Sequence, residues 1–360
     1  MTLGGERGMA GTNTQVILAA YPEGLPKESD FRVVTAPMPE PGEGEFLVRS
    51  LLLSLDPWQR LRMRPPIEFG RQYGRPIQPG ELVPGAILGE VIRSRHPHFK
   101  PGEIVEGKLG WQSYAVSTGS GNRVNDAEGV TKIDPSLGPL STALGVLGRT
   151  GMSAYFALLD LARPKPGETV VVTAAAGATG SIVGQLAKLA GCRAVGLAGS
   201  EAKIRHIVDE LGFDAGVNYT ASADLSAALK EAGPDGIDIY IDNVGGPVAD
   251  AMLEQMNDWA RWVVVGQIAE YDKAIHEYRG LRPQGYVLAK RLRMEGFVIH
   301  DYAPRFPEAQ RRMSRWIKEG RLQYREHIVK GLENAPRAFI DMLQGKNIGK
   351  ALVQIGPLPA

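Results

Sequence analysis

The stretch from Gly167 to Gly199 constrains the fold of this chain more than any other. It contains a short β-branched run at Thr169–Val172, which follows the breaker pair Pro166-Gly167 and is typical of a buried parallel strand. From residue 181 the apolar residues recur at helical spacing until Gly191, and residues 193–197 form a second apolar run. The stretch therefore predicts one complete strand, helix, strand unit.

A turn of small residues joins the first strand to the helix of this unit. Its sequence from 174 to 180 is Ala-Ala-Ala-Gly-Ala-Thr-Gly, spelled AxxGxxG. Small side chains let the backbone turn tightly and let a phosphate approach the amides at the start of the helix. The turn predicts a dinucleotide-binding site at Ala176, Gly177, Ala178, Thr179 and Gly180. The alternative is an ordinary buried unit in which these residues serve only close helix–strand packing.

Composition excludes several other classes of protein. Lys and Arg number 41 against 40 Asp and Glu, and the basic residues form no long stripe, so we expect no nucleic-acid partner. We also expect no membrane span, since no apolar run is long enough to cross a bilayer. The first residues lack a signal-peptide pattern, which predicts a cytoplasmic protein.

The sequence offers few ligands for a metal ion. Its single cysteine, Cys192, excludes an internal disulfide and is expected to pack as a small hydrophobe in the parallel sheet. The histidines show no close helical pairing, and His96 and His98 belong to a loop sequence. Because a catalytic zinc needs about three protein ligands, we expect no metal.

The chain changes in character near residue 140. Before it, short strands alternate with Pro and Gly breakers, as in a compact, mostly antiparallel β-domain. After it, strands alternate with helices, which predicts α/β architecture with a doubly wound parallel sheet. We therefore expect a β-domain at 1–145, a dinucleotide-binding domain at 146–322, and a C-terminal segment at 323–360 that returns to the first domain.

The elements expected beyond Gly199 follow the same alternation. The predicted helices are Lys203–Leu211, Leu225–Ala232, Val248–Met256, Pro307–Glu319 and Pro336–Leu343. The predicted strands are Ala215–Tyr219, Ile237–Asp242, Trp262–Val265 and Ala351–Ile355.

Several separated motifs occur in the order of a known family. They are Leu53–Met63, Gly110–Val116, Ala174–Gly180, Tyr240–Gly246, Arg293–Phe297, Gly331–Pro336 and Gly345–Lys350. With these motifs the chain resembles, from about Gln15 to Ile355, the medium-chain dehydrogenase/reductase superfamily, in its zinc-independent branch of leukotriene/prostaglandin reductases, alkenal double-bond reductases and curcumin-reductase-like enzymes. The resemblance implies a GroES-like β-domain, a Rossmann domain and a homodimer.

The residues after the second strand bear on which nicotinamide cofactor binds. A carboxylate there takes the ribose hydroxyls of NAD, whereas a 2′-phosphate requires a cation. Ser200 ends the strand, and Glu201 follows it as the argument for NAD. In the family that the chain resembles, residues matching Lys203 and Tyr219 hold the 2′-phosphate, so the resemblance implies NADPH. The alternative for Lys203 is a solvated lysine on a helix surface.

By the same resemblance, further segments follow the cofactor. Asn243 and the segment Gly266, Gln267 to Tyr271 are expected along the pyrophosphate and nicotinamide, Phe297 and Val298 beside them, and Asn347 from the C-terminal segment. Such segments follow parallel strands, at the sheet edge where these ligands bind. The sequences around Asn243 and Asn347 also suit turns that need no ligand.

The resemblance breaks at the catalytic tyrosines. One family tyrosine is replaced by Ala289 and another by Trp58. Tyr286 lies three residues before Ala289, so on a helix it shares that face and is the candidate hydrogen-bond donor; it is also a candidate core aromatic. Tyr73 and Tyr271 are further candidates for the substrate pocket, and Trp58 is expected to line it.

With these residues, the resemblance implies a zinc-free reductase that transfers hydride from NADPH to the carbon–carbon double bond of an α,β-unsaturated ketone or aldehyde. Two alternatives stay open. One is an NADPH-dependent carbonyl or quinone reductase, for which loss of the two tyrosines matters less. The other is a non-catalytic NADPH-binding sensor, for which their loss is the characteristic feature.

Overall fold

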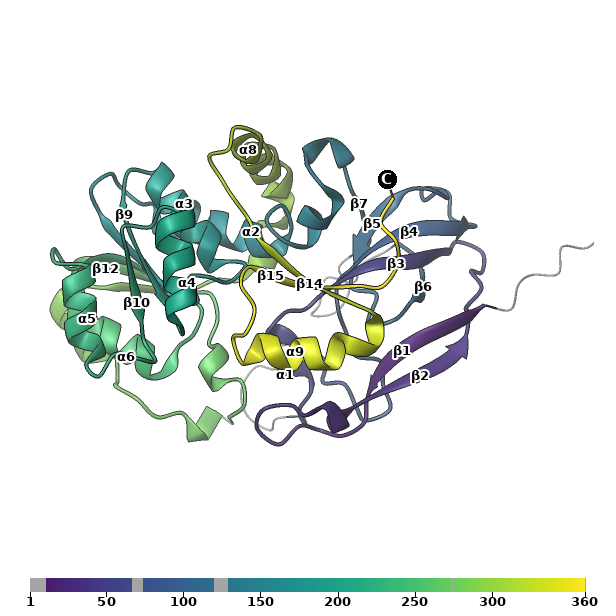
Figure 1. Ribbon diagram of the computed structural model, residues 1–360, viewed down its shortest axis with the longest axis horizontal. Helices are drawn as coiled ribbons and strands as arrows, with labels where there is room; N and C mark the ends of the chain where they lie inside the picture. The colour runs from purple at the N-terminus through teal and green to yellow at the C-terminus, as the bar shows by residue number, and fades with distance from the viewer. Residues whose placement is uncertain (1–10, 67–73, 120–128, 274, 360) are drawn as a thin grey trace, which may run out of the picture. The chain divides into compact units, whose positions relative to one another are not determined.

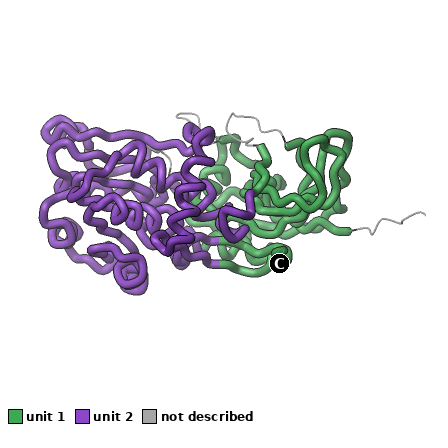
Figure 2. Tube along the Cα trace, turned by 90° about the horizontal axis from the view of Figure 1, so that it is seen from above, with its two compact units in different colours: residues 1–133, 328–340, 352–360 green, residues 134–327, 341–351 purple. Residues whose placement is uncertain are grey.

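The computed structural model describes residues 11–66, 74–119, 129–273 and 275–359 of the chain. It divides into two compact units (Figure 2). Unit 1 comprises residues 1–133, 328–340 and 352–360, and unit 2 comprises residues 134–327 and 341–351. The chain thus returns to unit 1 near its end.

Unit 1 is built mainly from antiparallel strands (Figure 1). Strands β1 and β2 pair over their full length, Thr12 opposite Pro37 and Leu18 opposite Phe31. A larger sheet has the order β14-β15-β3-β4-β5-β7, and β6 also pairs with β3. The elements are β1 Thr12–Leu18, β2 Phe31–Pro37, β3 Phe46–Ser54, α1 Trp58–Arg62, β4 Ile87–Ser94, β5 Ile104–Gly107, β6 Tyr114–Ser117, β7 Thr131–Lys132, β14 Glu326–Lys330, α9 Ala335–Leu343 and β15 Lys350–Gln354.

Unit 2 contains a six-stranded parallel sheet with the order β10-β9-β8-β11-β12-β13. Its strands are β8 Thr169–Val172, β9 Arg193–Ala198, β10 Ala215–Asn218, β11 Ile237–Asp242, β12 Met256–Val264 and β13 Arg293–Gly296. Its helices are α2 Arg149–Tyr155, α3 Gly180–Leu189, α4 Glu201–Arg205, α5 Leu225–Ala232, α6 Gly246–Gln255, α7 Gln284–Lys290 and α8 Phe306–Lys318. Together, the antiparallel unit and this sheet form a GroES-like and Rossmann arrangement.

The two faces of the parallel sheet bury separate hydrophobic cores. Side chains alternate along a strand, so Val170 and Val172 of β8 join one core and Val171 joins the other. The first core includes Phe156 and Trp316, and the second includes Tyr240, Trp262 and Met252. Burial on both faces explains why β8 is β-branched throughout, as its sequence pattern indicated.

The order in which successive strands are added to the sheet reverses between β8 and β11. From β8 the sheet grows to β9 and β10, and it then resumes on the other side of β8 with β11, β12 and β13. In open parallel sheets, ligands bind beyond the carboxyl ends of the strands at such a switch point. Thr173 directly follows β8 and Asn243 directly follows β11, which places both at this point.

Some elements differ from the sequence-based predictions. Strand β12 begins at Met256 rather than Trp262. The predicted helix Lys203–Leu211 begins at Glu201, where Ser200 Oγ accepts a hydrogen bond from the Lys203 amide, and continues after Arg205 as a π-helix over His206–Glu210. Strands β13 and β14 were not predicted, because mostly exposed strands lack an apolar run.

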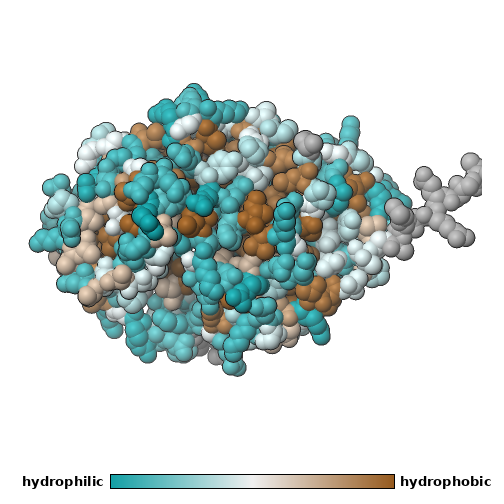
Figure 3. All heavy atoms as spheres, in the orientation of Figure 1, coloured by the Kyte–Doolittle hydropathy of each residue, from teal (hydrophilic) through white to brown (hydrophobic). Residues whose placement is uncertain are grey.

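The face shown in Figure 3 carries hydrophilic and hydrophobic residues side by side. Among the described residues, the helices are too short or too polar to cross a membrane.

Candidate cofactor and catalytic site

The small-residue turn after β8 has the geometry of a phosphate-binding turn. Gly180 is essential to it, since a Cβ there would lie 2.3 Å from the Ala174 carbonyl oxygen. Ala174 takes a left-handed conformation, with φ +52°, and the Gly177 amide donates to its carbonyl at 2.9 Å. The backbone of Ala174 therefore adopts a conformation that glycine takes more readily.

Helix α3 begins directly on this turn. Thr179 stands at its N-cap but gives no side-chain cap; its hydroxyl donates to the Thr150 carbonyl at 3.4 Å. The start of a helix presents amides and a partial positive charge. Because it has no side-chain cap, the start of α3 suits an anionic ligand. The small residues Ala176, Gly177 and Ala178 directly precede it.

Glu201, the carboxylate after β9 that argued for NAD, is hydrogen-bonded to another side chain of the protein. Glu201 Oε1 accepts a hydrogen bond from Asn218 Nδ2 at 2.7 Å. Glu201 and Asn218 line a cavity of about 390 Å³ beside the edge strand β10, together with small residues such as Ala215, Gly216 and Ala221. The cavity lies along the strand edge rather than over the glycine turn.

Lys203 on α4 and Tyr219 after β10 both lie near the end of β9. The Tyr219 hydroxyl lies so close to Gly199 that a Cβ on Gly199 would be 3.1 Å from it. Lys203 is half-buried, and burial lowers the pKa of its ammonium group. Its Nζ donates a hydrogen bond to the Gly345 carbonyl. A desolvated cation and an exposed phenol that both lie near the end of β9 suit a 2′-phosphate.

The turn after β11 is fastened to the residue after β8. The Asn243 amide donates to Thr173 Oγ1, and Asn243 Nδ2 donates to the Thr173 carbonyl, both at 2.8 Å. These bonds hold the Asn243 side chain at the switch point. Its carbonyl oxygen is left to meet an amide donor, such as that of a nicotinamide.

Asp242 is a buried residue that the sequence analysis missed as part of the site. Its side chain is fully buried, and Oδ1 accepts hydrogen bonds from the amides of Val244 at 3.0 Å and Gly245 at 2.9 Å. Burial raises the pKa of this carboxyl above its usual value, while the backbone hydrogen bonds oppose that shift. Asp242 thereby fixes the turn that presents Asn243.

The segment after β12 packs onto the same turn. The Gly266 amide donates to the Asp242 carbonyl at 3.0 Å, and a Cβ on Gly266 would lie 3.2 Å from the Asn243 carbonyl oxygen. The Gln267 amide donates to the Tyr271 hydroxyl at 3.3 Å, which ties that ring to the segment. Two segments that follow neighbouring strands thus lie together.

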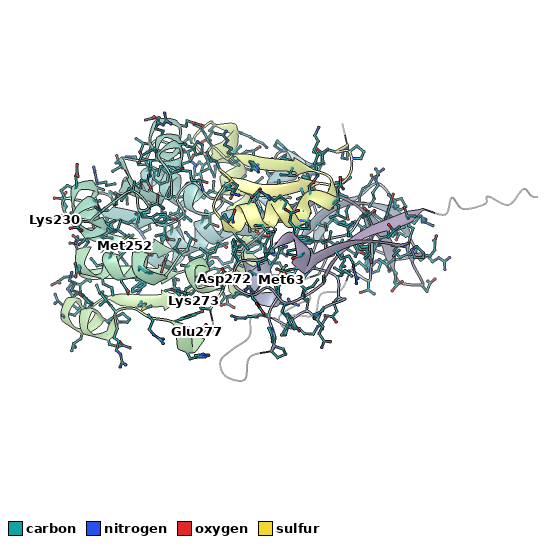
Figure 4. The ribbon with its side chains drawn as sticks, turned by 60° about the horizontal axis from the view of Figure 1, so that its bottom comes forward. Met63, Lys230, Met252, Asp272, Lys273 and Glu277 are labelled. Atoms are coloured by element: carbon teal, nitrogen blue, oxygen red, sulfur yellow. The ribbon has the colours of Figure 1, made fainter. Side chains whose placement is uncertain are left out.

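An ion pair between a buried carboxylate and a half-exposed lysine lies at the end of this segment. Glu270 is 3% exposed, and it pairs with Lys273, labelled in Figure 4, at 3.1 Å. No sequence pattern had singled out Glu270, because a carboxylate in a loop sequence is ordinarily solvated.

Asn347, in the C-terminal segment, belongs to a turn that reaches the glycine turn. The Gly349 amide donates to the Ala176 carbonyl at 2.8 Å, so residues 345–349 lie against the phosphate-binding segment. Asn347 Nδ2 itself donates to the Gly349 carbonyl at 2.8 Å. The side-chain amide therefore shapes the turn, and its oxygen is the atom left to meet a cofactor.

Phe297 and Val298 have different surroundings. The Phe297 ring is 8% exposed and stacks on Tyr302 with centroids 5.3 Å apart, inside the first core. Val298 is 48% exposed. Of this pair, the Phe297 side chain thus serves packing, and Val298 is the one whose side chain remains accessible.

Tyr286 lies on α7, which confirms that its segment is helical. The side chain is half-buried and packs against the core that contains Tyr240 and Trp262. Trp58 begins α1 in unit 1, half-buried, with Lys108 Nζ 5.0 Å from its ring centroid. Tyr73 lies outside the described residues.

Metal ligands do not gather in the part of the chain that the structure describes: it holds no group of three or more His, Cys, Asp or Glu side chains placed to bind an ion. Cys192 is 3% exposed and packs in the first core.

Comparisons with known proteins agree with this architecture. Residues 14–124 match the family model for the N-terminal domain of oxidoreductase, and residues 178–316 match the one for zinc-binding dehydrogenase. The NADPH-dependent curcumin reductase of Escherichia coli is 41% identical over 95% of this chain and 97% of its own. The NADP(+)-dependent 2-alkenal reductase of Nicotiana tabacum is 40% identical over 96% of this chain and 98% of its own.

A solved structure is similar over almost the whole chain. CurA from Vibrio vulnificus in complex with NADPH aligns with a TM-score of 0.86 and 41% identity, over 96% of this chain and all of its own. The fold and the matches define a two-domain, dinucleotide-dependent oxidoreductase. The chain belongs to the medium-chain dehydrogenase/reductase superfamily, in the branch of the curcumin, alkenal and prostaglandin reductases.

Proposed function

We propose that the protein is an NADPH-dependent reductase that adds hydride to the carbon–carbon double bond of an α,β-unsaturated ketone or aldehyde. The observation that supports this cofactor is that the carboxylate of Glu201 is bound to Asn218, while the cation Lys203 and the Tyr219 hydroxyl both lie near the end of β9. The curcumin and alkenal reductases named above support the substrate class.

The residues of unit 2 fit this cofactor. The turn Ala176–Gly180 and the uncapped start of α3 receive the pyrophosphate. Ser200, Lys203 and Tyr219 receive the ribose phosphate, and Asn243 orients the nicotinamide, with the segment Gly266–Tyr271 beside it. When bound, NADPH supplies the hydride, which goes to the β-carbon of the substrate.

The protein must stabilise the charge that develops on the substrate carbonyl oxygen. A hydrogen-bond donor aimed at that oxygen lowers the barrier, and solvent then protonates the α-carbon. We propose Tyr286 as this donor, because its ring is held by the core and its segment is helical. We propose Trp58, Tyr73 and Tyr271 as pocket residues. Trp58 supplies apolar area for an unsaturated substrate.

Ala289 and Trp58, in place of the family tyrosines, favour a second candidate, a carbonyl or quinone reductase. Product analysis separates it from the first. Incubation with NADPH and a panel of enones, enals and quinones is expected to give the saturated ketone or aldehyde. An alcohol or a hydroquinone as the main product contradicts the proposal and supports the second candidate. Tight NADPH binding without turnover of any substrate indicates a sensor.

We also propose that unit 1 holds the substrate and unit 2 the cofactor, with working boundaries at residues 1–145, 146–322 and 323–360. We further propose a cytoplasmic homodimer with no nucleic-acid partner. Strand β13 supports the dimer, because it ends the sheet and carries Met294, which is 43% exposed. Light scattering on the purified protein tests the dimer, and cell fractionation tests the compartment.

A further inference from the structure

We propose that the turn Gly345–Gly349 positions Lys203 and thereby determines selectivity for NADPH over NADH. The inference rests on the proposed function, since it concerns the same 2′-phosphate. It adds a selectivity element from the far end of the chain, made by backbone atoms rather than by a charged side chain. Lys203 and the group that holds it are 142 residues apart in sequence.

The turn is fixed at its start by the end of helix α9. The Gly345 amide donates to the Met342 carbonyl at 2.9 Å, and the Lys346 amide donates to the Asp341 carbonyl at 2.8 Å. Lys346 Nζ also pairs with the Asp341 carboxylate at 2.7 Å. Gly345 adopts φ +68°, a left-handed conformation that glycine takes at little cost.

The other end of the turn is fixed as firmly. The Gly349 amide donates to the Ala176 carbonyl at 2.8 Å. A Cβ on Gly349 would lie 2.1 Å from the Arg325 carbonyl oxygen, so the backbone of Arg325 closes directly over this glycine. With both ends held, the Gly345 carbonyl has a defined position relative to the glycine turn.

That carbonyl accepts a hydrogen bond from Lys203 Nζ. An ammonium group has three donors. One of them reaches Gly345, which leaves two for the oxygens of a 2′-phosphate. The bond therefore does not compete with the cofactor. It restrains a long, flexible side chain at the end of β9 before the cofactor arrives, and preorganisation of this kind raises affinity.

Burial gives the bond a second role. Lys203 is half-buried, and desolvation lowers the pKa of its ammonium group. A carbonyl oxygen within reach offsets part of the lost hydration and keeps the charged form in place. NADH lacks the 2′-phosphate and gains nothing from this arrangement, so disturbing the turn is expected to weaken NADPH binding selectively.

The ordinary explanation of the same contact is a lysine that caps the C-terminal carbonyls of a helix, with no role in the cofactor site. The two explanations differ in one measurable way. If the contact is only a structural cap, disturbing it changes the stability of the protein and the binding of both cofactors alike. If the contact positions Lys203, disturbing it weakens the binding of NADPH alone, and only while Lys203 is present.

The test is Gly345→Val, because a β-branched residue is strongly disfavoured at positive φ and displaces the carbonyl. Gly320→Val is the matched control. Gly320 also follows a helix, with φ +69°, and a Cβ there meets nothing within 4 Å. Titration of the fluorescence of NADPH and NADH with each protein gives both dissociation constants without turnover. Gly345→Ala is the milder variant if the valine protein does not fold.

Gly345→Val is expected to raise the dissociation constant of NADPH about ten-fold and that of NADH less than about two-fold. Gly320→Val is expected to change neither dissociation constant. In a Lys203→Met background, Gly345→Val is expected to have no further effect on NADPH. Equal weakening of both cofactors, or an undiminished effect without Lys203, overturns the inference and leaves the proposed function standing. A wild-type protein that does not prefer NADPH overturns both.

Discussion

Glu201 accepts a hydrogen bond from the side chain of Asn218, with 2.7 Å between Oε1 and Nδ2. The carboxylate that an NAD enzyme would use for the ribose hydroxyls is thus occupied by the end of the neighbouring strand β10. Lys203, two residues further along α4, donates a hydrogen bond to the Gly345 carbonyl instead. Glu201 and Lys203 have separate partners, so their contributions to cofactor binding can be measured separately.

Lys203→Met is expected to weaken NADPH binding about 10- to 100-fold and to leave NADH within about two-fold, because charge-assisted hydrogen bonds to a phosphate are lost. Glu201→Gln is the comparison variant. It keeps an acceptor for Asn218 and is expected to leave both dissociation constants within about two-fold. If Glu201→Gln strongly weakens NADH binding and Lys203→Met leaves NADPH binding unchanged, the cofactor assignment is wrong.

Tyr286→Phe is expected to lower kcat for an enone about 100-fold, the lower part of the usual range for loss of one hydrogen-bond donor to a developing oxyanion. The dissociation constant of NADPH and the thermal unfolding midpoint should stay the same, because the ring remains packed against the second core. Tyr271→Phe is the comparison, since the Tyr271 hydroxyl accepts from the Gln267 amide. Full activity of Tyr286→Phe would make Tyr286 a packing residue.

The sequence predicted the centre of the parallel sheet better than its edges. Strand β8 and the glycine turn are local patterns, in which burial on both faces demands β-branched residues and the turn demands small ones. Strand β13 was not predicted, because three of its four residues are exposed and it therefore lacks an apolar run. The turn also departs from the usual glycine motif, because its first residue is Ala174, which takes a left-handed conformation that glycine adopts more readily.

The site was predicted less completely, for a physical reason. Lys203, Tyr219 and Asn243 were predicted from the family resemblance, but the groups that contact them were not. Thr173 holds Asn243 from 70 residues away. Such contacts depend on how the parallel strands line up, and no local pattern encodes them.

Glu326 is expected to make stability depend on pH. Its Oε1 is buried without a hydrogen-bond partner, and burial raises the pKa of the carboxyl above its usual 4.5, while a hydrogen bond from Ser141 opposes the shift. A raised pKa in the folded state favours the protonated form. That stabilisation is complete below about pH 4.5 and is lost as the pH rises through the folded-state pKa.

Glu326→Gln lacks this titration. The free energy of unfolding of the variant, minus that of the wild type, is therefore expected to increase from about pH 4.5 upward. Urea unfolding of both proteins at a series of pH values measures it. Glu319→Gln, near the exposed end of α8, is the control for a surface carboxylate. A difference that stays constant or decreases with pH contradicts the role assigned to Glu326.

The state of Cys192 bears on the proposed substrate class, because α,β-unsaturated carbonyl compounds add to thiolates. Such an addition joins the sulfur to the β-carbon of the substrate and would alkylate the enzyme. Cys192 is 3% exposed, and its Sγ donates to the Lys165 carbonyl at 3.2 Å. Burial raises the pKa of the thiol from 9.0 to about 11, which reduces the thiolate fraction about a hundredfold.

The folded protein is accordingly expected to retain its activity and a free thiol after long incubation with an enone, whereas the urea-unfolded protein is alkylated at Cys192 within the same period. Intact-mass spectrometry counts the adducts. Cys192→Ala separates this from damage elsewhere, because any activity that it loses to the enone cannot arise at the thiol. Rapid alkylation of Cys192 in the folded wild type, with loss of activity that Cys192→Ala escapes, would show that its burial gives no protection. Retained activity with a free thiol would instead show that burial of Cys192 lets the enzyme turn over an electrophile that modifies most exposed cysteines.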